Sequence, residues 1–292
     1  MSVTVVRTGR SVLVFILFSG LMPCLRAGEG LKFDRRMSDC ENRWVVMKPD
    51  AGESTFHFGF VYIDPQAGFT FNYEGCLALG PEGRVIRVKS PLEKEKVSFK
   101  LRLDAQHNGV VALLPDEAIA TLGLEKVPSW LDIYKDGSDP VTHKVRWGFQ
   151  YNHMGASDRA LEYLESAWKA KPDAKGLAFE LAFAYNATKR YDQALGVLQA
   201  AGKQVENDLL LQKELAYAYM CSGRHAEAVK VYQRCLTALD TNDDEVRTEL
   251  AMNISQLYGA MGDEEQRKQW WEKARSWVPK DSPLAKYFKE KQ

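Results

Sequence analysis

Residues 177–201 read LAFELAFAYNATKRYDQALGVLQAA, and this stretch decides the fold of the second half of the chain. Residues 211–235 read LQKELAYAYMCSGRHAEAVKVYQRC and repeat the same order of small and aromatic residues 34 positions later. The positions that recur at this distance are Tyr151, Tyr185 and Tyr219; Ala160, Ala194 and Ala228; Ala167, Ala201 and Cys235; and Leu164, Leu198 and Tyr232. A period of this length corresponds to two helices joined by a turn, so the sequence predicts a stack of helix pairs.

Within each copy, the order of residues resembles the tetratricopeptide repeat, a family of helix–turn–helix repeats. The first copy carries the family's positions as Trp147-Gly148, Tyr151, Gly155, Ala160, Leu164, Ala167 and Pro172. The second copy has Leu181-Ala182, Tyr185, Ala194, Leu198 and Ala201, and the third has Leu215-Ala216, Tyr219, Gly223, Ala228, Tyr232 and Cys235. A fourth copy follows after a longer shift, with Ile254-Ser255, Tyr258, Gly262, Trp271, Ala274 and Pro279.

The resemblance implies an α-helical solenoid of four repeats over residues 141–292. The predicted repeats are 141–174, 175–208, 209–242 and 248–281, followed by a capping helix, 282–292, with Leu284 and Phe288 one helical turn apart. Two residues depart from the family's pattern: Lys189 replaces the turn glycine of the second repeat, and Arg267 replaces a small alanine of the fourth. We therefore expect the last helix pair to pack more loosely than the others.

Residues 28–140 are predicted to form an antiparallel β-rich domain, which makes the chain an α+β multidomain protein. Phe56, Phe58, Phe60 and Tyr62 alternate with other residues, and a turn at 64–68 follows, as in a β-hairpin. The sequence predicts further strands at 84–89, 97–103, 110–114 and 130–134, and a short helix from 115 to 122. We expect the sheet to curl around its aromatic face, with the short helix as a plug.

The first 27 residues have the pattern of a secretory signal. Arg7 and Arg10 precede an apolar run over residues 11–25, and Ala27 is a small residue at which cleavage can occur. An apolar run of this length spans about 22 Å as a helix, less than the roughly 30 Å of a bilayer core. We expect a periplasmic or secreted protein; an uncleaved anchor and a lipoprotein anchored through Cys24 are the alternatives.

The charge balance argues against a nucleic-acid or membrane-surface partner. The chain has 39 basic and 39 acidic side chains, so it lacks the basic excess that phosphate binding requires. Its five histidines show no metal-ligand spacing, and no Cys-x-x-Cys or phosphate-binding glycine loop occurs. The sequence therefore predicts no enzyme, no cofactor and no metal site. A thiol dyad of His57 with Cys40 or Cys76 is the alternative that would make the protein an enzyme.

Cysteine positions predict one disulfide. Cys40 and Cys76 lie in the same predicted domain and can be oxidised in an exported protein, so we expect them to be linked. Cys221 and Cys235 are separated by a distance of about 15–20 Å along two predicted helices, beyond the roughly 7 Å limit for a bridge. We expect these two to be free thiols.

The function that the resemblance implies is protein binding. In tetratricopeptide proteins the first helix of each pair lines a concave groove, which holds an extended peptide or a partner helix. The groove residues predicted here are Phe149, Asn152, Phe179, Phe183, Asn186, Lys213 and Tyr217. We expect the asparagines to bond a peptide backbone and the aromatic rings to take its side chains.

Two other interpretations of the aromatic residues remain open in the sequence. The groove aromatics could pack against the β-rich domain or a capping segment instead of a ligand. The face of Phe56, Phe58, Phe60 and Tyr62 could stack on sugars, which would make the protein carbohydrate- or cell-wall-binding with the repeats as an assembly platform.

The signal prediction is tested by the mature N-terminus. N-terminal sequencing of the exported protein is expected to begin at Gly28, because cleavage follows the small residue Ala27. A mature form that retains Val14 or Phe15 would show that the segment is an anchor.

Overall fold

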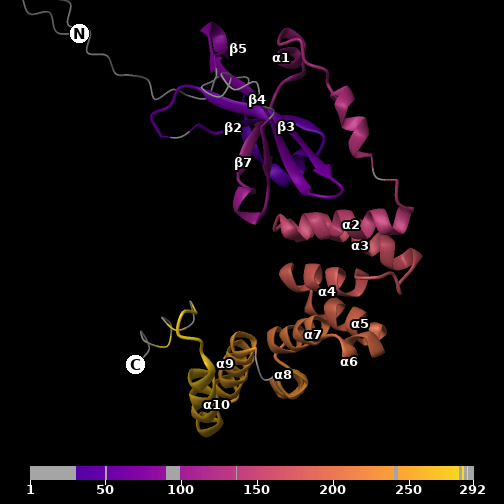
Figure 1. The fold of residues 1–292 in the computed structure, drawn as a ribbon, viewed down its shortest axis with the longest axis vertical. Coiled ribbons are helices and arrows are strands. Elements are labelled where there is room, and N and C mark those ends of the chain that lie inside the picture. The colour runs from indigo at the N-terminus through magenta and orange to yellow at the C-terminus, as the bar shows by residue number, and fades with distance from the viewer. Residues whose placement is uncertain are drawn as a thin grey trace, which may run out of the picture.

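The computed structural model describes residues 31–49, 51–89, 99–135, 137–239, 243–282, 285 and 288. An antiparallel sheet lies at one end of the molecule, and antiparallel helix pairs follow it along a curved path (Figure 1). The sheet thus comes first and the helical stack second, as the sequence predicts.

The sheet is antiparallel throughout, with strand order β1-β7-β2-β3-β4-β5 and β6 paired to β4. Its longest strands, β3 (Phe56–Asp64) and β4 (Gly68–Leu79), form the predicted hairpin, which is confirmed. Gly75 faces Phe58 and Tyr73 faces Gly59, so Glu74 is an extra residue that bulges from β4. The other strands are β1 (Phe33–Arg36), β2 (Arg43–Met47), β5 (Val85–Val88), β6 (Lys100–Arg102) and β7 (Val110–Leu113).

The aromatic face of β3 is core. Phe56, Phe58, Phe60 and Tyr62 are all buried, beneath α1 (Asp116–Thr121) and the 3-10 helix Ser129–Tyr134. Trp130 packs edge-on against Phe60 and Tyr62, with ring centroids 5.8 and 5.3 Å apart. A sheet face closed in this way offers no platform for a sugar.

The predicted strand at 130–134 is wrong, because these residues form the 3-10 helix. A strand would direct Trp130, Asp132 and Tyr134 to the same side. Only Trp130 and Tyr134 pack against the sheet. The helix directs Asp132 outward, where it forms an ion pair of 2.9 Å with Lys135. Pro128 at the N-cap favours the turn.

The helical part consists of antiparallel pairs. Helices α2 and α3, α4 and α5, α7 and α8, and α9 and α10 pack against each other, and each pair packs on the next. Their bounds are α2 (Pro140–His153), α3 (Ser157–Ala170), α4 (Leu177–Ala187), α5 (Tyr191–Ala201), α7 (Leu209–Cys221), α8 (His225–Ala238), α9 (Asp244–Ala260) and α10 (Glu264–Trp277). A further short helix, α6 (Lys203–Asn207), was not predicted; it follows Gly202, whose positive φ of 47° ends α5 early.

The small repeat positions lie where two helices approach closely. Ala160, Ala194 and Ala228 are fully buried, and a Cβ on Gly148 would overlap the side chain of Leu164. At the turn of the second pair, Lys189 adopts the left-handed conformation with φ of 61°, as the glycines at the other turns do. The repeat geometry therefore imposes this conformation even on a lysine.

The sheet docks on the first helix pair through the carboxylate of Glu41. Trp147 Nε1 donates a hydrogen bond of 2.8 Å to Glu41 Oε1, and the Tyr151 hydroxyl donates one of 2.7 Å to Oε2. Burial and the Glu41 charge both raise the pKa of Tyr151. Around them, Val61, Ile63, Phe69 and Phe71 of the second sheet face share one buried cluster with Trp147, Tyr151 and Leu164. The sheet thus covers the end of the stack where a preceding repeat would otherwise lie.

At the other end of the stack, fewer described residues cover the last helix pair. Phe288 is buried with its ring centroid 4.6 Å from that of Trp271 in α10. Leu284 and most of the predicted capping helix, 282–292, lie outside the described residues, so this helix stays a prediction.

Within the part of the chain that the structure describes, no helix is both long enough and apolar enough to span a bilayer. The apolar run of residues 11–25 lies outside that part.

The close helix contact at Ala194 generates a stability prediction. Replacing this buried alanine with leucine is expected to lower the free energy of unfolding by about 1–3 kcal/mol through overpacking. Arg267→Leu, at the matching position of α10, is expected to have a mild effect, because the aliphatic part of Arg267 already lies against Gly259. Urea unfolding measures both variants, and equal losses would show that the alignment of the fourth predicted repeat is wrong.

Candidate binding groove

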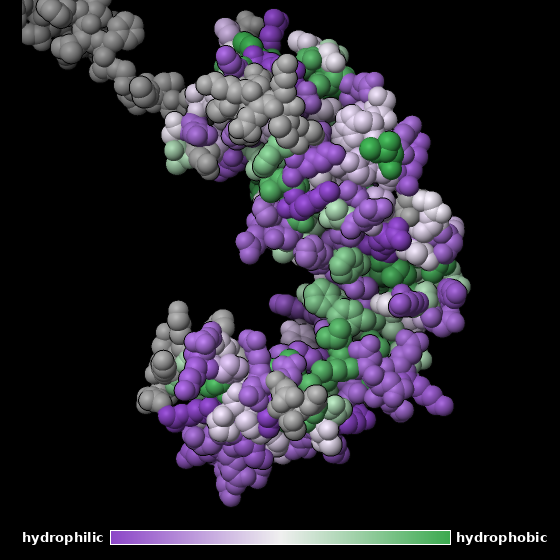
Figure 2. Space-filling model, viewed as in Figure 1, coloured by the Kyte–Doolittle hydropathy of each residue, from purple (hydrophilic) through white to green (hydrophobic). Residues whose placement is uncertain are grey.

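Three aromatic rings on successive first helices are exposed. Phe149 on α2, Phe183 on α4 and Tyr217 on α7 occupy the same position of the repeat, with exposed fractions of 45%, 36% and 40%. Figure 2 shows apolar side chains gathered on the middle of the concave rim, over α4 and α7. The interpretation that this stripe packs against the sheet is therefore wrong, because the sheet contacts Trp147 and Tyr151 instead.

A cavity of 550 Å³ lies between α4, α7 and α9 on this side. It brings together four of the predicted groove residues, Phe183, Asn186, Lys213 and Tyr217, with Glu214, Glu249 and Asn253. Phe149, Asn152 and Phe179 do not line it. Phe179 is partly buried, and its ring centroid lies 6.3 Å from that of Phe183.

The two asparagines of the groove have a different role from the predicted one. Asn152 and Asn186 have exposed fractions of only 8% and 3%. Asn152 Nδ2 donates to the Glu180 carbonyl at 3.0 Å and to Glu180 Oε2 at 2.8 Å. Asn186 Nδ2 donates to the Glu214 carbonyl at 3.1 Å and to Glu214 Oε2 at 2.8 Å. Their N–H groups therefore join each first helix to the next and are not free for a peptide backbone.

Sequence reasoning missed Glu180 and Glu214, the partners of the two asparagines, of which Glu214 lines the cavity. Burial raises the pKa of both carboxyls; the bonds from the asparagines oppose this, and the Glu214 charge adds to the rise at Glu180. The signal was present in the sequence, since Asn152 to Glu180 and Asn186 to Glu214 are both steps of 28 residues. The predicted groove cation is not available, because Lys213 Nζ forms a 2.8 Å ion pair with Glu249.

The predicted Cys40–Cys76 disulfide is also wrong in this structure, where both are buried free thiols. Cys40 lies just before Asn42, whose N–H bonds the carbonyl of Val61, whereas Cys76 pairs with His57 near the start of β3. The strand from His57 to Val61 spans about 13 Å, too far for a bridge. Burial raises the pKa of Cys40 to about 11. Cys221 and Cys235 are also free thiols.

Cys76 lies beside His57, as the alternative thiol dyad requires. Its Sγ is 3.4 Å from His57 Nδ1 and 3.3 Å from the Tyr73 hydroxyl, which is itself 3.3 Å from Nδ1. However, Cys76 is buried, so its sulfur is closed to a substrate. The three side chains form a packed polar cluster across the β3–β4 hairpin.

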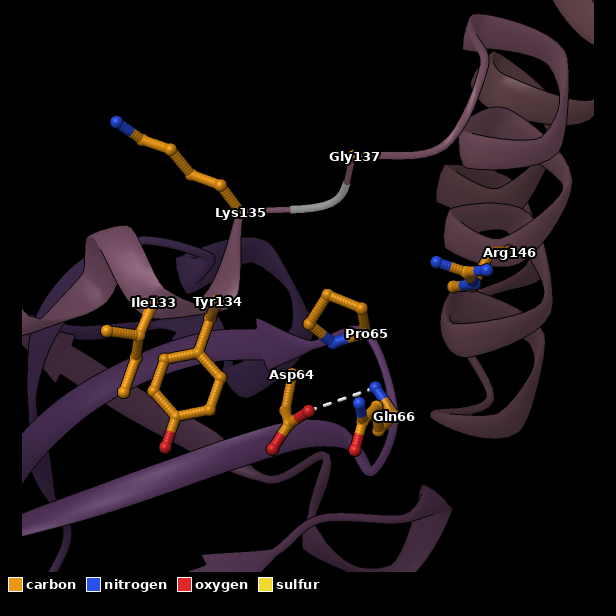
Figure 3. A pocket seen from close by; sticks show the side chains of 8 residues that line it. All are labelled: Asp64, Pro65, Gln66, Ile133, Tyr134, Lys135, Gly137 and Arg146. Carbon is orange, nitrogen blue, oxygen red and sulfur yellow. Dashed lines mark hydrogen bonds between the residues drawn. The ribbon is translucent and has the colours of Figure 1, made fainter.

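A second cavity lies where the sheet meets the helices. It measures about 490 Å³ and is lined by the turn at Asp64–Gln66, by residues 133–135 and Gly137, and by Arg146 of α2 (Figure 3). Asp64 Oδ1 accepts the N–H of Gln66 at 2.9 Å, and Oδ2 forms an ion pair of 3.2 Å with Arg102. The buried carboxylate of this cavity is thus already engaged, and none of the predicted site residues lines it.

Comparison with known proteins identifies the class of the helical part. Tetratricopeptide-repeat family models match residues 153–216 and 211–247, so the chain contains tetratricopeptide repeats. The fourth predicted repeat lies outside the matched residues. No curated protein gives a significant match.

Among solved structures, the chain is similar to several of MamA. MamA AMB-1 is 25% identical, over 51% of this chain and 85% of that chain, with a TM-score of 0.43. MamA MSR-1 is 24% identical, over 50% of this chain and 82% of that chain, with a TM-score of 0.43. MamA 41-end from Desulfovibrio magneticus RS-1 is 18% identical, over 56% of this chain and 85% of that chain, with a TM-score of 0.43.

The raised pKa of the partly buried Glu214 carboxyl generates a prediction about pH. Because the pKa of Glu214 is higher in the folded chain than the ordinary value of 4.5, the folded state binds the proton more tightly than the unfolded state. Protonation of Glu214 therefore stabilises the folded chain, and this stabilisation is lost as the pH rises above 4.5 and through the raised pKa. Glu214→Gln is expected to make the free energy of unfolding depend less on pH. Relative to the native chain, this variant should become more stable as the pH increases.

Urea unfolding at a series of pH values from about 4 to 8 measures this difference. Glu117→Gln, in the exposed first turn of α1, is the matched control and should follow the native chain. Parallel pH profiles for Glu214→Gln and the native chain would contradict the raised pKa.

Proposed function

We propose that this chain is a non-catalytic binding or scaffold protein that acts outside the cytoplasm. Its concave groove holds an extended peptide or a partner helix. The observation that carries the proposal is the exposed stripe of Phe149, Phe183 and Tyr217, repeated once in each of the first three helix pairs beside a cavity of 550 Å³. Aromatic rings held on a rigid concave surface are the side chains that contribute most to protein–protein affinity.

The helical stack gives the stripe its rigidity. Each ring belongs to a first helix whose opposite side is buried, and the Asn152 and Asn186 bonds fix the spacing between these helices. A preorganised groove of this kind binds without the entropic cost of its own ordering. In this proposal α9 and α10 are a fourth repeat, with Phe288 and its neighbours as the cap.

Export is part of the same proposal and rests on the order of basic, apolar and small residues in the first 27 positions. The partner is a protein or peptide. The carbohydrate alternative loses its basis, because the rings of Phe56, Phe58, Phe60 and Tyr62 are enclosed in the core.

Truncation of the central ring tests the groove. Peptides selected from a random library on the mature protein serve as the ligand, and calorimetry measures their affinity. Phe183→Ala is expected to weaken binding at least tenfold, because a central aromatic contributes about 2 kcal/mol or more. Phe99→Ala, the same change at an exposed ring of the β domain, is the control and should bind like the native chain.

Stability of the same variants separates the groove from an internal contact. Phe183→Ala should keep its melting temperature, whereas Asn186→Ala should lose about 1–3 kcal/mol of stability, because it leaves a half-buried carboxylate without its donor. Unchanged binding with a lowered melting temperature in Phe183→Ala would end the groove proposal.

A further inference from the structure

Two equivalent polar sites lie on successive first helices, one on α4 and one on α7, and the second of them lines the cavity of the groove. Each consists of a glutamate and the asparagine of the preceding first helix: Glu180 with Asn152, and Glu214 with Asn186. The two glutamates are one repeat period apart, so they occupy the same place in successive helix pairs. A ligand that runs along the groove meets them in order.

Each site offers acceptors only. Both N–H groups of each asparagine amide are used, one on the glutamate carbonyl and one on its carboxylate. Asn152 Oδ1 and Asn186 Oδ1 have no hydrogen-bond partner, but both atoms are closed to solvent, so the acceptor that a ligand reaches at each site is the carboxylate. Each carboxylate accepts from its asparagine at Oε2 and has further lone pairs for a donor from outside.

The charge of the two sites is not balanced within the described chain. Neither Glu180 nor Glu214 forms an ion pair with a described Lys, Arg or His side chain. Lys213 is near enough to lower the pKa of Glu214, but its ammonium group is held by Glu249. Burial of an unpaired carboxylate is unfavourable, so a cation that arrives with a ligand relieves it. An anionic ligand would add to the repulsion.

Exposed aromatic rings flank the carboxylate of α7. Phe183 and Tyr217 line the same cavity as Glu214 and Asn186. The face of an aromatic ring attracts an ammonium or guanidinium group, and a carboxylate beside it strengthens the preference for a cation. Aromatic faces and an acceptor-only site therefore point to the same ligand chemistry.

From these observations, and resting on the groove function proposed above, we propose that the groove selects a basic segment. Two Lys or Arg side chains of an extended partner occupy the sites at Glu180 and Glu214. Packed helices lie about 8–10 Å apart, and an extended segment in the polyproline II conformation advances about 3.1 Å per residue and returns to the same side every third residue. The two cations are therefore about three residues apart in the partner, and apolar side chains between and beside them cover Phe183 and Tyr217.

Synthetic peptides test the selectivity directly. Four peptides of equal length and equal aromatic content are titrated into the mature protein by calorimetry: two Lys about three residues apart, the same positions as Gln, the same positions as Glu, and two adjacent Lys. The first is expected to bind at least tenfold more tightly than the Gln peptide, to exceed the adjacent-Lys peptide, and to weaken as salt is added. The Glu peptide is expected to bind least.

Variants of the chain assign the effect to the two sites. Glu180→Gln and Glu214→Gln together should reduce the preference for the Lys peptide over the Gln peptide to less than threefold. Glu206→Gln, at an exposed residue of helix α6, is the matched control and should keep this preference. Glu214→Asp, which keeps a carboxylate at this position, is expected to keep part of the preference for the Lys peptide.

The outcomes separate this inference from the groove function. Equal affinity for Lys, Gln and Glu peptides, with all of them weakened by Phe183→Ala, would overturn the basic segment and leave the groove standing. Lys binding that Phe183→Ala does not change would overturn the groove itself. A preference for the Glu peptide, or no binding of the Lys peptide at about 1 mM, would also overturn the basic segment.

Discussion

The carboxylate of Glu41 carries the contact on which the rest of the architecture depends. It accepts hydrogen bonds from Trp147 and Tyr151, two side chains that the repeat pattern turns toward the neighbouring pair. Among the described residues no helix pair precedes the first one, so without the sheet these large polar-edged rings would face water. The sheet supplies an apolar surface, in which the ring centroid of Phe69 lies 5.1 Å from that of Tyr151. Glu41 supplies the acceptor that the buried N–H and O–H groups need.

Once the first pair is closed in this way, the later helix pairs follow by repetition. Each first helix is tied to the next by an asparagine that spans to a glutamate, at Asn152 and again at Asn186. Between α7 and α9 the ion pair of Lys213 and Glu249 takes over the same task. Fixed links between first helices hold the concave side at a constant spacing, which leaves the rings of the aromatic stripe aligned and open to solvent.

The sequence predicted what depends on periodicity. Recurrence of the same residues gave the helix pairs and the exposed stripe, and alternation gave the β3–β4 hairpin, because both patterns follow from which side of an element is buried. The Cys40–Cys76 pairing failed because it depends on strand register, which composition does not contain. The prediction of a strand at 130–134 was wrong because this segment covers the sheet without pairing with it, and its conformation follows from packing on the aromatic rings of β3. Asn152 and Asn186 were assigned to a ligand because their glutamate partners become visible only across two helices.

The two ends of the stack are closed very unequally, and this gives the molecule a direction. At the sheet end, one buried cluster runs without interruption from the strands through α5 into α7. At the other end, the buried residues form smaller separate clusters, and the last contains only Ala251, Ala274 and Phe288 among the described residues. In a linear array each unit is supported only by its neighbours, so local opening begins where support is least. Amide exchange should therefore be fastest in α10 and slow progressively toward the strands, so that the chain unravels from its C-terminal side while the sheet still holds the first repeats.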